Sequence, residues 1–515
     1  MKFLVLLFSD KNEFQDKKIF PSLDGSEKSA FERSQEWAAA LEFEGAQKEV
    51  AVLDGKGWTS GQLMEQIAAK AKAAAANFVV YAQASAAFLD LPLSKKLIQD
   101  HIEFKAEYTF ADGYPAGFAP EIIDSGAAAI MAQLCKTASA ESAKKPVCKD
   151  SVFDIIKGDV NSFEIETEIA GADYRLLRLD FLCSSNLNAL AAESLAKKLA
   201  ADGKQGLLEL DKEKLGEENV LAICEAAARE TCVLKTVPAF YNIQIEGRVF
   251  CKKSFSPYKP CEERMSFEKF EALAQKAKAF SGQAVLSLSL FGEAALHPDF
   301  DKFLLCAAGA GFGVFVEIDG GLLPEFLQGQ AYKNICSALD FEARKKIYFA
   351  VCLDAASQKT FEEFHQGDLE AACAAVKALS AEFPETYPQL VRVQKNEDEL
   401  EAFFRFWSDK NSPSNGKIIV QKYDYFCGLL PQEKTADLAP IDREPCWHLR
   451  RDMDILLDGS VPMCRDLFLG EPLGNAFEDD LRDIWKNKDA LLAEHVKKEY
   501  RNSCGNCDEW HTFNF

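Results

Sequence analysis

The sequence predicts an α/β protein made of two α/β domains followed by a small cysteine-rich domain. Short runs rich in Val, Leu and Ile alternate with amphipathic helical stretches over residues 1–140, and the same rhythm returns over residues 236–430. The segment 440–515 breaks this rhythm and carries clustered cysteines. A chain of 515 residues has room for about three domains, which agrees with this division.

The N-terminal region should form a largely parallel sheet covered by helices. Strands are expected at residues 3–8, 49–54 and 77–83, and helices at residues 29–43 and 61–76. Strands that are separated by helices usually pair in parallel. A polar segment then interrupts the pattern, and residues 141–235, in which we find no candidate site, are expected to bridge two domains.

The central region, residues 236–430, reads as six strand and helix units in series. Strands are expected at residues 239–247, 284–292, 313–321, 346–355, 388–394 and 417–426. Ser266 is a suitable N-cap for the first intervening helix. Six such units predict an open or partial (β/α)6 barrel, in which ligands bind at the C-terminal ends of the strands.

Charge and cysteine usage limit the class of protein. The net charge is −22, from 81 acidic and 59 basic residues, and such a surface repels phosphate backbones and anionic lipid. We therefore expect no nucleic acid or membrane partner. The sequence shows no export signal and no apolar stretch of the roughly 18 residues that span a bilayer. A cytoplasmic, reducing location follows, where the 16 cysteines are thiols or metal ligands.

Two cysteine pairs near the C-terminus predict a metal site. Cys446 and Cys464 flank a predicted β-hairpin whose turn is Asp458-Gly459, and Cys504 and Cys507 are separated by two residues. Two pairs of thiolates are the donor set of both structural zinc sites and iron–sulfur clusters. Spacing does not choose between the two.

Two histidines near these cysteines leave the zinc interpretation open. His448 and His511 could replace a thiolate in a zinc site, although each can also be an ordinary exposed polar residue. Six other cysteines stand singly among apolar residues and are expected to be core residues: Cys183, Cys224, Cys306, Cys336, Cys352 and Cys373.

The C-terminal segment resembles the SPASM domain, the auxiliary-cluster module of many radical SAM enzymes. Twelve residues separate Cys446 from Gly459 and four separate Gly459 from Cys464, as in the opening motif of that family. The stretch LGNAFEDDLRDIW also matches, but the three later cysteines of the full-length domain are missing. The resemblance is to the half-length version, and it implies one [4Fe–4S] cluster on Cys446, Cys464, Cys504 and Cys507.

The central region resembles a radical SAM domain. In LSLFGEAALHPDF, Gly292 and Glu293 match the residues that bind the amino group of S-adenosylmethionine in that family. The family carries three cysteines in the loop after the first barrel strand, whereas this loop holds only Cys251 and Cys261. Two thiolates do not supply three ligands, and completion of the set by Cys232 would be unusual. Reductive cleavage of S-adenosylmethionine is therefore expected to be lost.

The N-terminal region resembles the sugar nucleotidyltransferase (cytidylyltransferase-like) fold. KIFPSLDG and YAQASAAFLD match two segments of that family, but its glycine-rich phosphate loop is absent and Ser85 replaces its metal-binding Asp. Asp90 is expected to begin the next helix. The order of nucleotidyltransferase-like, radical SAM-like and SPASM-like regions resembles the spiro-SPASM proteins, a family whose name implies no known reaction.

Three functions remain open at this stage. The first is an iron–sulfur pseudoenzyme with one cluster and a redox, scaffold or docking role toward a protein or peptide partner. The second is an active radical SAM/SPASM enzyme that modifies a peptide or an envelope-sugar precursor, favoured by the retained Gly292 and Glu293. The third is a zinc protein in which the four thiols only stabilise the C-terminus.

Overall fold

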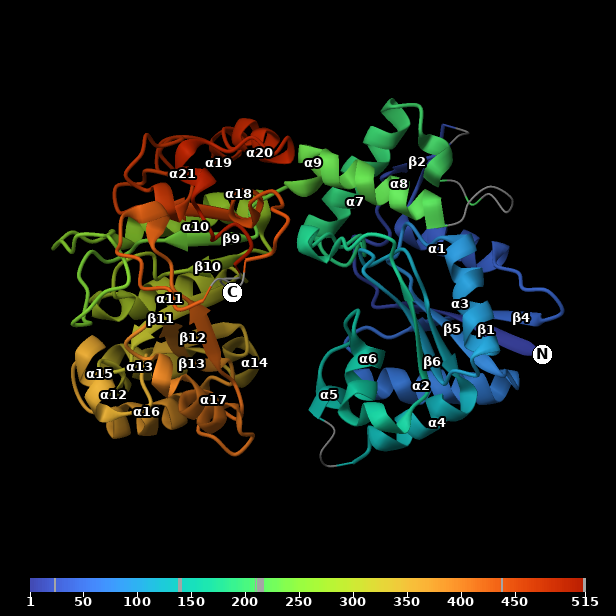
Figure 1. Ribbon diagram of the computed structural model, residues 1–515, viewed down its shortest axis with the longest axis horizontal. Helices are drawn as coiled ribbons and strands as arrows, with labels where there is room; N and C mark the ends of the chain where they lie inside the picture. Colours follow the sequence, from blue (N-terminus) through green and yellow to red (C-terminus); the bar gives the residue numbers. More distant parts are fainter. Residues whose placement is uncertain (23–24, 138–140, 209, 211–216, 437–438, 513–515) are drawn as a thin grey trace. The chain divides into compact units, whose positions relative to one another are not determined.

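The chain folds into two compact units, Met1–Thr236 and Val237–Phe515, which are described separately below (Figure 1). The structure is a computed structural model. It describes residues 1–22, 25–137, 141–208, 210, 217–436 and 439–512.

The first unit is built on a six-stranded mixed sheet with the strand order β4-β1-β5-β7-β6-β8. Its strands are β1 (Lys2–Ser9), β4 (Gln47–Asp54), β5 (Phe78–Gln83), β6 (Tyr108–Asp112), β7 (Glu121–Asp124) and β8 (Ile165–Ile169), and a short ribbon pairs β2 (Phe20–Pro21) with β3 (Glu27–Lys28). The central strand β1 is buried along nearly all its length and pairs in parallel with β4 and β5, which confirms the three strands predicted here. Strand β7 is antiparallel to both its neighbours.

Helices cover this sheet, and capping residues in the sequence fix where several of them begin. The helices of the unit are α1 (Ala30–Ala40), α2 (Ser60–Ala74), α3 (Leu91–Glu103), α4 (Ser125–Leu134), α5 (Glu141–Lys144), α6 (Ser151–Ile156), α7 (Asn186–Ala201), α8 (Glu217–Arg229) and α9 (Thr231–Leu234). Reciprocal capping boxes begin α1 at Ser29 and α2 at Thr59. Asp90 caps α3, since its carboxylate accepts the Leu93 N–H at 2.7 Å, as the sequence predicted.

Residues 141–236 belong to this first unit. Strand β8 extends the sheet by pairing in parallel with β6, and its neighbour Phe163 joins the apolar core beneath the sheet. That core also contains side chains from α2 and α4, which lie side by side in Figure 1. The segment expected to be a bridge is thus a part of the N-terminal sheet and its helical cover.

The second unit is built on a seven-stranded, fully parallel sheet that curls into a half-barrel. Its strands are β9 (Phe240–Ile243), β10 (Val285–Ser287), β11 (Gly313–Asp319), β12 (Ile347–Cys352), β13 (Thr386–Arg392), β14 (Ile419–Lys422) and β15 (Asp452–Ile455), in the order β14-β13-β12-β11-β10-β9-β15. Every pairing is parallel. The six predicted central strands are confirmed, and the seventh comes from the C-terminal segment.

The predicted hairpin at Asp458-Gly459 is wrong. The chain does turn there, but the arm after the turn forms only an isolated bridge between Ser460 and Asn475. Strand β15 pairs instead with the open edge of β9, whose backbone groups would otherwise lack partners. Met453 and Ile455 are fully buried in the barrel core, which favours this pairing over a two-stranded hairpin.

Helices cover the outer face of the half-barrel and reach into the C-terminal segment. They are α10 (Phe267–Ser281), α11 (Phe300–Gly309), α12 (Leu323–Gln328), α13 (Gln330–Ala338), α14 (Phe341–Arg344), α15 (Gln358–Phe364), α16 (Leu369–Glu382), α17 (Leu400–Ser408), α18 (Trp447–Arg451), α19 (Leu481–Lys486), α20 (Asp489–Val496) and α21 (Asn502–Gly505). Ile484 and Trp485 of α19 are buried in the same core as α10. The C-terminal segment is therefore anchored to the barrel by apolar packing.

Candidate metal centre

The four predicted ligands come from separate segments and line one cavity of the second unit. Cys446 immediately precedes α18, Cys464 precedes a one-turn helix, Cys504 lies in α21 and Cys507 follows it. All four contribute to the wall of a cavity of about 640 Å³. Backbone hydrogen bonds hold the first segment against the last, since the Trp447 N–H donates to the Trp510 carbonyl at 2.9 Å.

The electrostatics of the four thiols favour a bound cation. Burial raises the pKa of Cys446 to about 12, and the proximity of Cys507 and Cys504 raises it further. Burial and nearby acidic groups also raise the pKa of Cys464, and burial with Cys507 raises that of Cys504. Thiolates buried this close together repel one another, and a metal centre relieves that repulsion.

A metal cluster fits this donor set. The four cysteines all line the same cavity, and four cysteine thiolates are the donor set of a [4Fe–4S] cluster or of a structural zinc ion. The histidine alternative is weaker, because both ring nitrogens of His448 already have partners: Nδ1 lies 2.6 Å from Asp452 and Nε2 lies 3.0 Å from the Glu509 carbonyl. His511 lines the cavity and its ring packs on Trp510.

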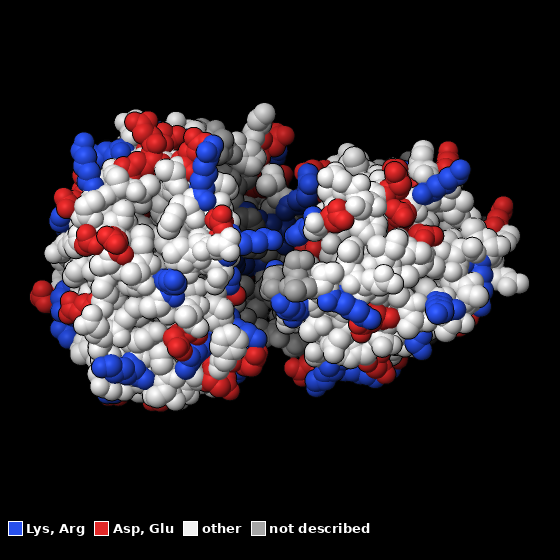
Figure 2. Space-filling view, turned by 90° about the horizontal axis from the view of Figure 1, so that it is seen from below, with Lys and Arg blue, Asp and Glu red and all other residues white. Residues whose placement is uncertain are grey.

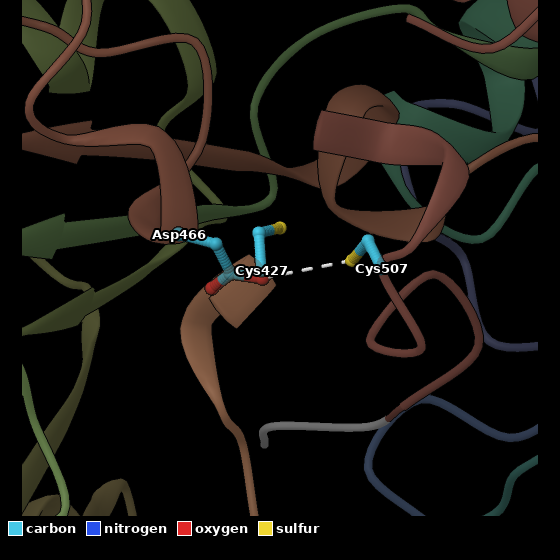
Figure 3. Close-up of side chains that lie close together, drawn as sticks. All are labelled: Cys427, Asp466 and Cys507. Carbon is cyan, nitrogen blue, oxygen red and sulfur yellow. Dashed lines mark hydrogen bonds between the residues drawn. The ribbon is translucent and has the colours of Figure 1, made fainter. Parts of the chain in front are cut away.

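A fifth thiol, Cys427, lies at this centre and was not predicted. The ligand atoms of Cys427, Asp466 and Cys507 all lie within 4.8 Å of one another (Figure 3). The hydrogen bond from Cys427 lowers the pKa of Cys507 to about 7 against the opposing effect of burial. In sequence, Cys427 stands alone after the last barrel strand, and its place at a strand end followed by a glycine is the one signal that could have identified it.

Charged side chains surround the thiols. The half-buried Arg465 guanidinium lies 2.5 Å from Asp424 and 3.5 Å from Asp466. Lys422 pairs with Asp508 at 3.0 Å and with Glu509. These pairs fix the wall next to Cys464 and Cys507 and set the local electrostatic field of the centre.

The same cavity extends to the C-terminal ends of the barrel strands, where Gly292 and Glu293 lie. Glu293 accepts the Asp319 N–H at 3.0 Å and the Ala295 N–H at 3.4 Å. Burial, with Asp319 and Glu317 nearby, raises the pKa of Glu293 to about 8. At Gly292 a Cβ atom would lie only 1.8 Å from the Glu246 carbonyl oxygen. Both residues therefore have structural roles in this fold.

A buried imidazole joins two other strand ends at the cavity wall. His365 Nδ1 lies 2.7 Å from Asp319 and Nε2 lies 3.0 Å from Asp354. Burial alone would lower the pKa of His365, but these two carboxylates raise it to about 9. Next to them, Cys352, which we expected to be a core residue, also lines the cavity.

The first barrel loop separates its two cysteines. Cys251 lines the cavity, and burial together with Asp319 and Glu293 raises its pKa to about 12. Cys261 packs instead against Gly247 and lies 3.1 Å from the Tyr258 hydroxyl. Cys232, the distant thiol considered above, lies in α9 of the first unit. Among the described residues of this loop, only one thiol reaches the cavity.

Comparison with known proteins finds a relative that matches most of the chain. An uncharacterized protein of Treponema pallidum (strain Nichols) is 34% identical over 385 residues, which cover 72% of this chain and 99% of that protein. The chain belongs to the same family as this protein. Residues 446–508 also match the SPASM family, an iron-sulfur cluster-binding domain, and this range contains all four predicted ligands.

Solved structures give partial likenesses. SuiB of Streptococcus suis bound to precursor peptide SuiA is 16% identical, with a TM-score of 0.39, over 62% of this chain and 83% of SuiB. BtrN in complex with AdoMet and 2-DOIA is 14% identical, with a TM-score of 0.34, over 53% of this chain and 94% of BtrN. Native anSMEcpe with bound AdoMet is 12% identical, with a TM-score of 0.35, over 51% of this chain and 84% of anSMEcpe.

The surface shows how the acidic excess is distributed. On the face drawn in Figure 2, acidic and basic side chains lie mixed over each unit. Among the helices in the described part of the chain, none combines the length and apolar character required to cross a bilayer.

Proposed function

We propose that this protein carries one [4Fe–4S] cluster on Cys446, Cys464, Cys504 and Cys507 and that it does not cleave S-adenosylmethionine reductively. One observation carries the proposal. Cys446, Cys464, Cys504 and Cys507 all line the cavity, whereas of the two cysteines in the first barrel loop only Cys251 does. A cluster that binds S-adenosylmethionine needs three thiolates and a free iron there.

The proposed role is electron transfer between the cluster and a molecule or partner bound at the cavity. When bound, such a cluster supplies one-electron redox chemistry. The residues of the chain would hold it at the cavity wall, where Arg465 and Lys422 pair with acidic neighbours and where Arg443 and Arg501 favour the thiolate of Cys504. A protein or peptide partner and a cytoplasmic location remain part of this proposal.

The retained Gly292 and Glu293 fit a non-catalytic barrel as well as an active one. Replacement of Gly292 would drive a side chain into the Glu246 backbone. Glu293 accepts two backbone N–H groups and so joins the end of β10 to the end of β11. Selection for the fold alone is therefore sufficient to keep both residues, which removes the main reason to expect catalysis.

We propose that the first unit is a nucleotidyltransferase-like domain that has lost nucleotidyl transfer activity. We also propose that the chain is a spiro-SPASM protein. Ser85 is buried where that fold would place a metal-binding carboxylate. Asp90 is used as a helix cap and contacts the Asn219 side chain at 3.5 Å.

The second candidate is an active radical SAM/SPASM enzyme acting on a peptide or an envelope-sugar precursor. The observation that favours it is the size of the cavity, about 640 Å³, which is large enough for a small ligand. A zinc protein is the third candidate, since four cysteine thiolates also satisfy zinc.

Reductive cleavage separates these candidates. Protein reconstituted with iron and sulfide without oxygen would be mixed with S-adenosylmethionine and dithionite, and free deoxyadenosine would be measured. We expect no more than in a reaction without reductant. Sustained formation that is abolished in Cys251→Ala, but not in the matched Cys306→Ala, would overturn the proposal and establish the enzyme.

A further inference from the structure

Cys427 lies in a turn with an unusual backbone. The chain leaves β14 and passes through three consecutive left-handed residues, Phe426 (φ 50°), Cys427 (φ 53°) and Gly428 (φ 98°). The left-handed conformation costs a residue other than glycine about 1–2 kcal/mol. Strained backbone of this kind persists where neighbouring contacts impose it, and it is concentrated at functional sites.

The contacts that impose it tie this turn to the thiol site. The Phe426 N–H donates to Asp424 Oδ1 at 2.7 Å, and the other oxygen of Asp424 accepts from Arg465 at 2.5 Å. The Arg465 guanidinium also lies 5.1 Å above the Phe426 ring. On the other side, the Tyr425 hydroxyl donates to the Asn506 carbonyl, between Cys504 and Cys507. The turn is therefore fixed against two of the ligand-bearing segments.

These contacts place the Cys427 thiol next to a predicted ligand. The sulfurs of Cys427 and Cys507 and an oxygen of Asp466 lie within 4.8 Å of one another, and Cys507 Sγ is 3.7 Å from Asp466 Oδ2 (Figure 3). Two sulfurs that each lie about 2.3 Å from one metal ion can be at most about 4.6 Å apart. A small adjustment thus lets either thiol reach the same metal position.

We propose that Cys427 is an exchange ligand, able to take the metal position that Cys507 occupies. The inference rests on the proposed cluster. Such a cluster takes four thiolate ligands, and with Cys427 five thiols are present, so one thiol is not needed at any one time. In the exchange, the bond from Cys427 forms as the bond from Cys507 breaks, and the proton lost by Cys427 passes to the released Cys507 sulfur. No electron changes hands.

The test compares iron and acid-labile sulfide per chain in Cys427→Ala, Cys507→Ala, Cys504→Ala and Cys427→Ala/Cys507→Ala, all as full-length protein reconstituted without oxygen. Each single variant at this pair should keep more than about half of the wild-type iron, because one of the two thiols remains. Cys504→Ala and the double variant should keep less than about half of the iron that Cys507→Ala keeps, because each leaves the cluster with three thiolates in place of four. Cys306→Ala/Cys507→Ala is the matched control and should behave like Cys507→Ala.

Two results would overturn the inference, and they are distinguishable. If Cys507→Ala loses its iron as completely as Cys504→Ala while the wild-type protein holds iron, Cys427 is no substitute and only this inference fails. If the wild-type protein itself takes up no iron and sulfide, the proposed function fails and this inference fails with it. Far-ultraviolet circular dichroism of each variant shows whether a loss of iron reflects a loss of fold.

Discussion

The two ends of the cavity differ in the thiols that they bring to its wall. At the C-terminal end, thiols from distant segments meet in a buried wall pinned by ion pairs. At the first barrel loop, Cys251 enters the cavity but Cys261 packs against Gly247. The surrounding half-barrel is intact at both ends. The capacity to bind a cluster therefore depends on where the donor atoms lie, and the barrel alone does not confer it.

The comparison also shows that a residue can match a cofactor-binding motif for structural reasons alone. Gly292 and Glu293 match a cofactor-binding motif, yet a close backbone approach and two backbone hydrogen bonds explain them. No such packing reason explains five thiols around one wall, because burial raises the cost of each thiolate. The thiol end is the stronger evidence for function.

The largest expected effect is the loss of the cluster from one end only. Cys504→Ala should lose more than about half of its bound iron, because it removes one of the four proposed thiolate ligands. Cys251→Ala should keep the wild-type iron content. Iron and sulfide analysis of both variants checks this, and equal losses would show that the two ends share one centre.

The next effect tests whether the packing of the C-terminal segment on the barrel depends on bound metal. Trp485→Ala should destabilise the second unit by about 4 kcal/mol even in metal-free protein, because the ring is buried in the barrel core. Urea unfolding with and without a chelator measures it. Trp407→Ala, also in this core but on α17, is the matched control; a Trp485→Ala effect seen only with metal bound would mean that the metal builds the scaffold.

His365 should make the barrel end sensitive to pH. Its pKa is raised from about 6.5 in the unfolded chain to about 9 in the fold, so its stabilising contribution is complete below pH 6.5 and is lost as the pH rises through 9. At about 1.4 kcal/mol per pH unit, the contribution is on the order of 3 kcal/mol. His365→Gln should flatten the fall in unfolding free energy across that interval; an unchanged slope would contradict the assignment.

The smallest effect concerns the glycine of the cofactor motif. Gly292→Ala should destabilise the fold by about 2 kcal/mol without any cofactor present, since its Cβ would overlap the Glu246 carbonyl. Gly309→Ala is the matched control, because a Cβ there meets nothing within 4 Å. Thermal melts of both variants check this, and an unperturbed Gly292→Ala protein would restore the cofactor explanation.

Local sequence signals predicted the strands and singled out four cysteines that line one cavity. The six central strands are short apolar runs between helical stretches, and Cys446, Cys464, Cys504 and Cys507 stand in two recognisable pairs. What the sequence did not predict depends on distant partners. Strand β15 forms because the edge of β9 is open to it, and β8 joins the first unit by pairing with β6.

Cys427 also could not be assigned to the site from the sequence, because its position depends on distant residues. Along the chain, only its place after a predicted strand and before a glycine sets it apart from the single core cysteines. Its role emerges only when Asp424, Arg465 and Tyr425 fix its turn beside Cys507. Pairing across 80 residues is a property of the tertiary structure, which neither periodicity nor spacing reports.

Iron and acid-labile sulfide per chain, measured with an absorption spectrum on protein purified without oxygen, test the central claim most directly. The account predicts about four irons and four sulfides, with the broad visible absorption of an iron–sulfur cluster. About eight irons would place a second cluster at the barrel loop despite its single inward thiol, and colourless zinc-containing protein would remove the cluster altogether; either result would contradict the account.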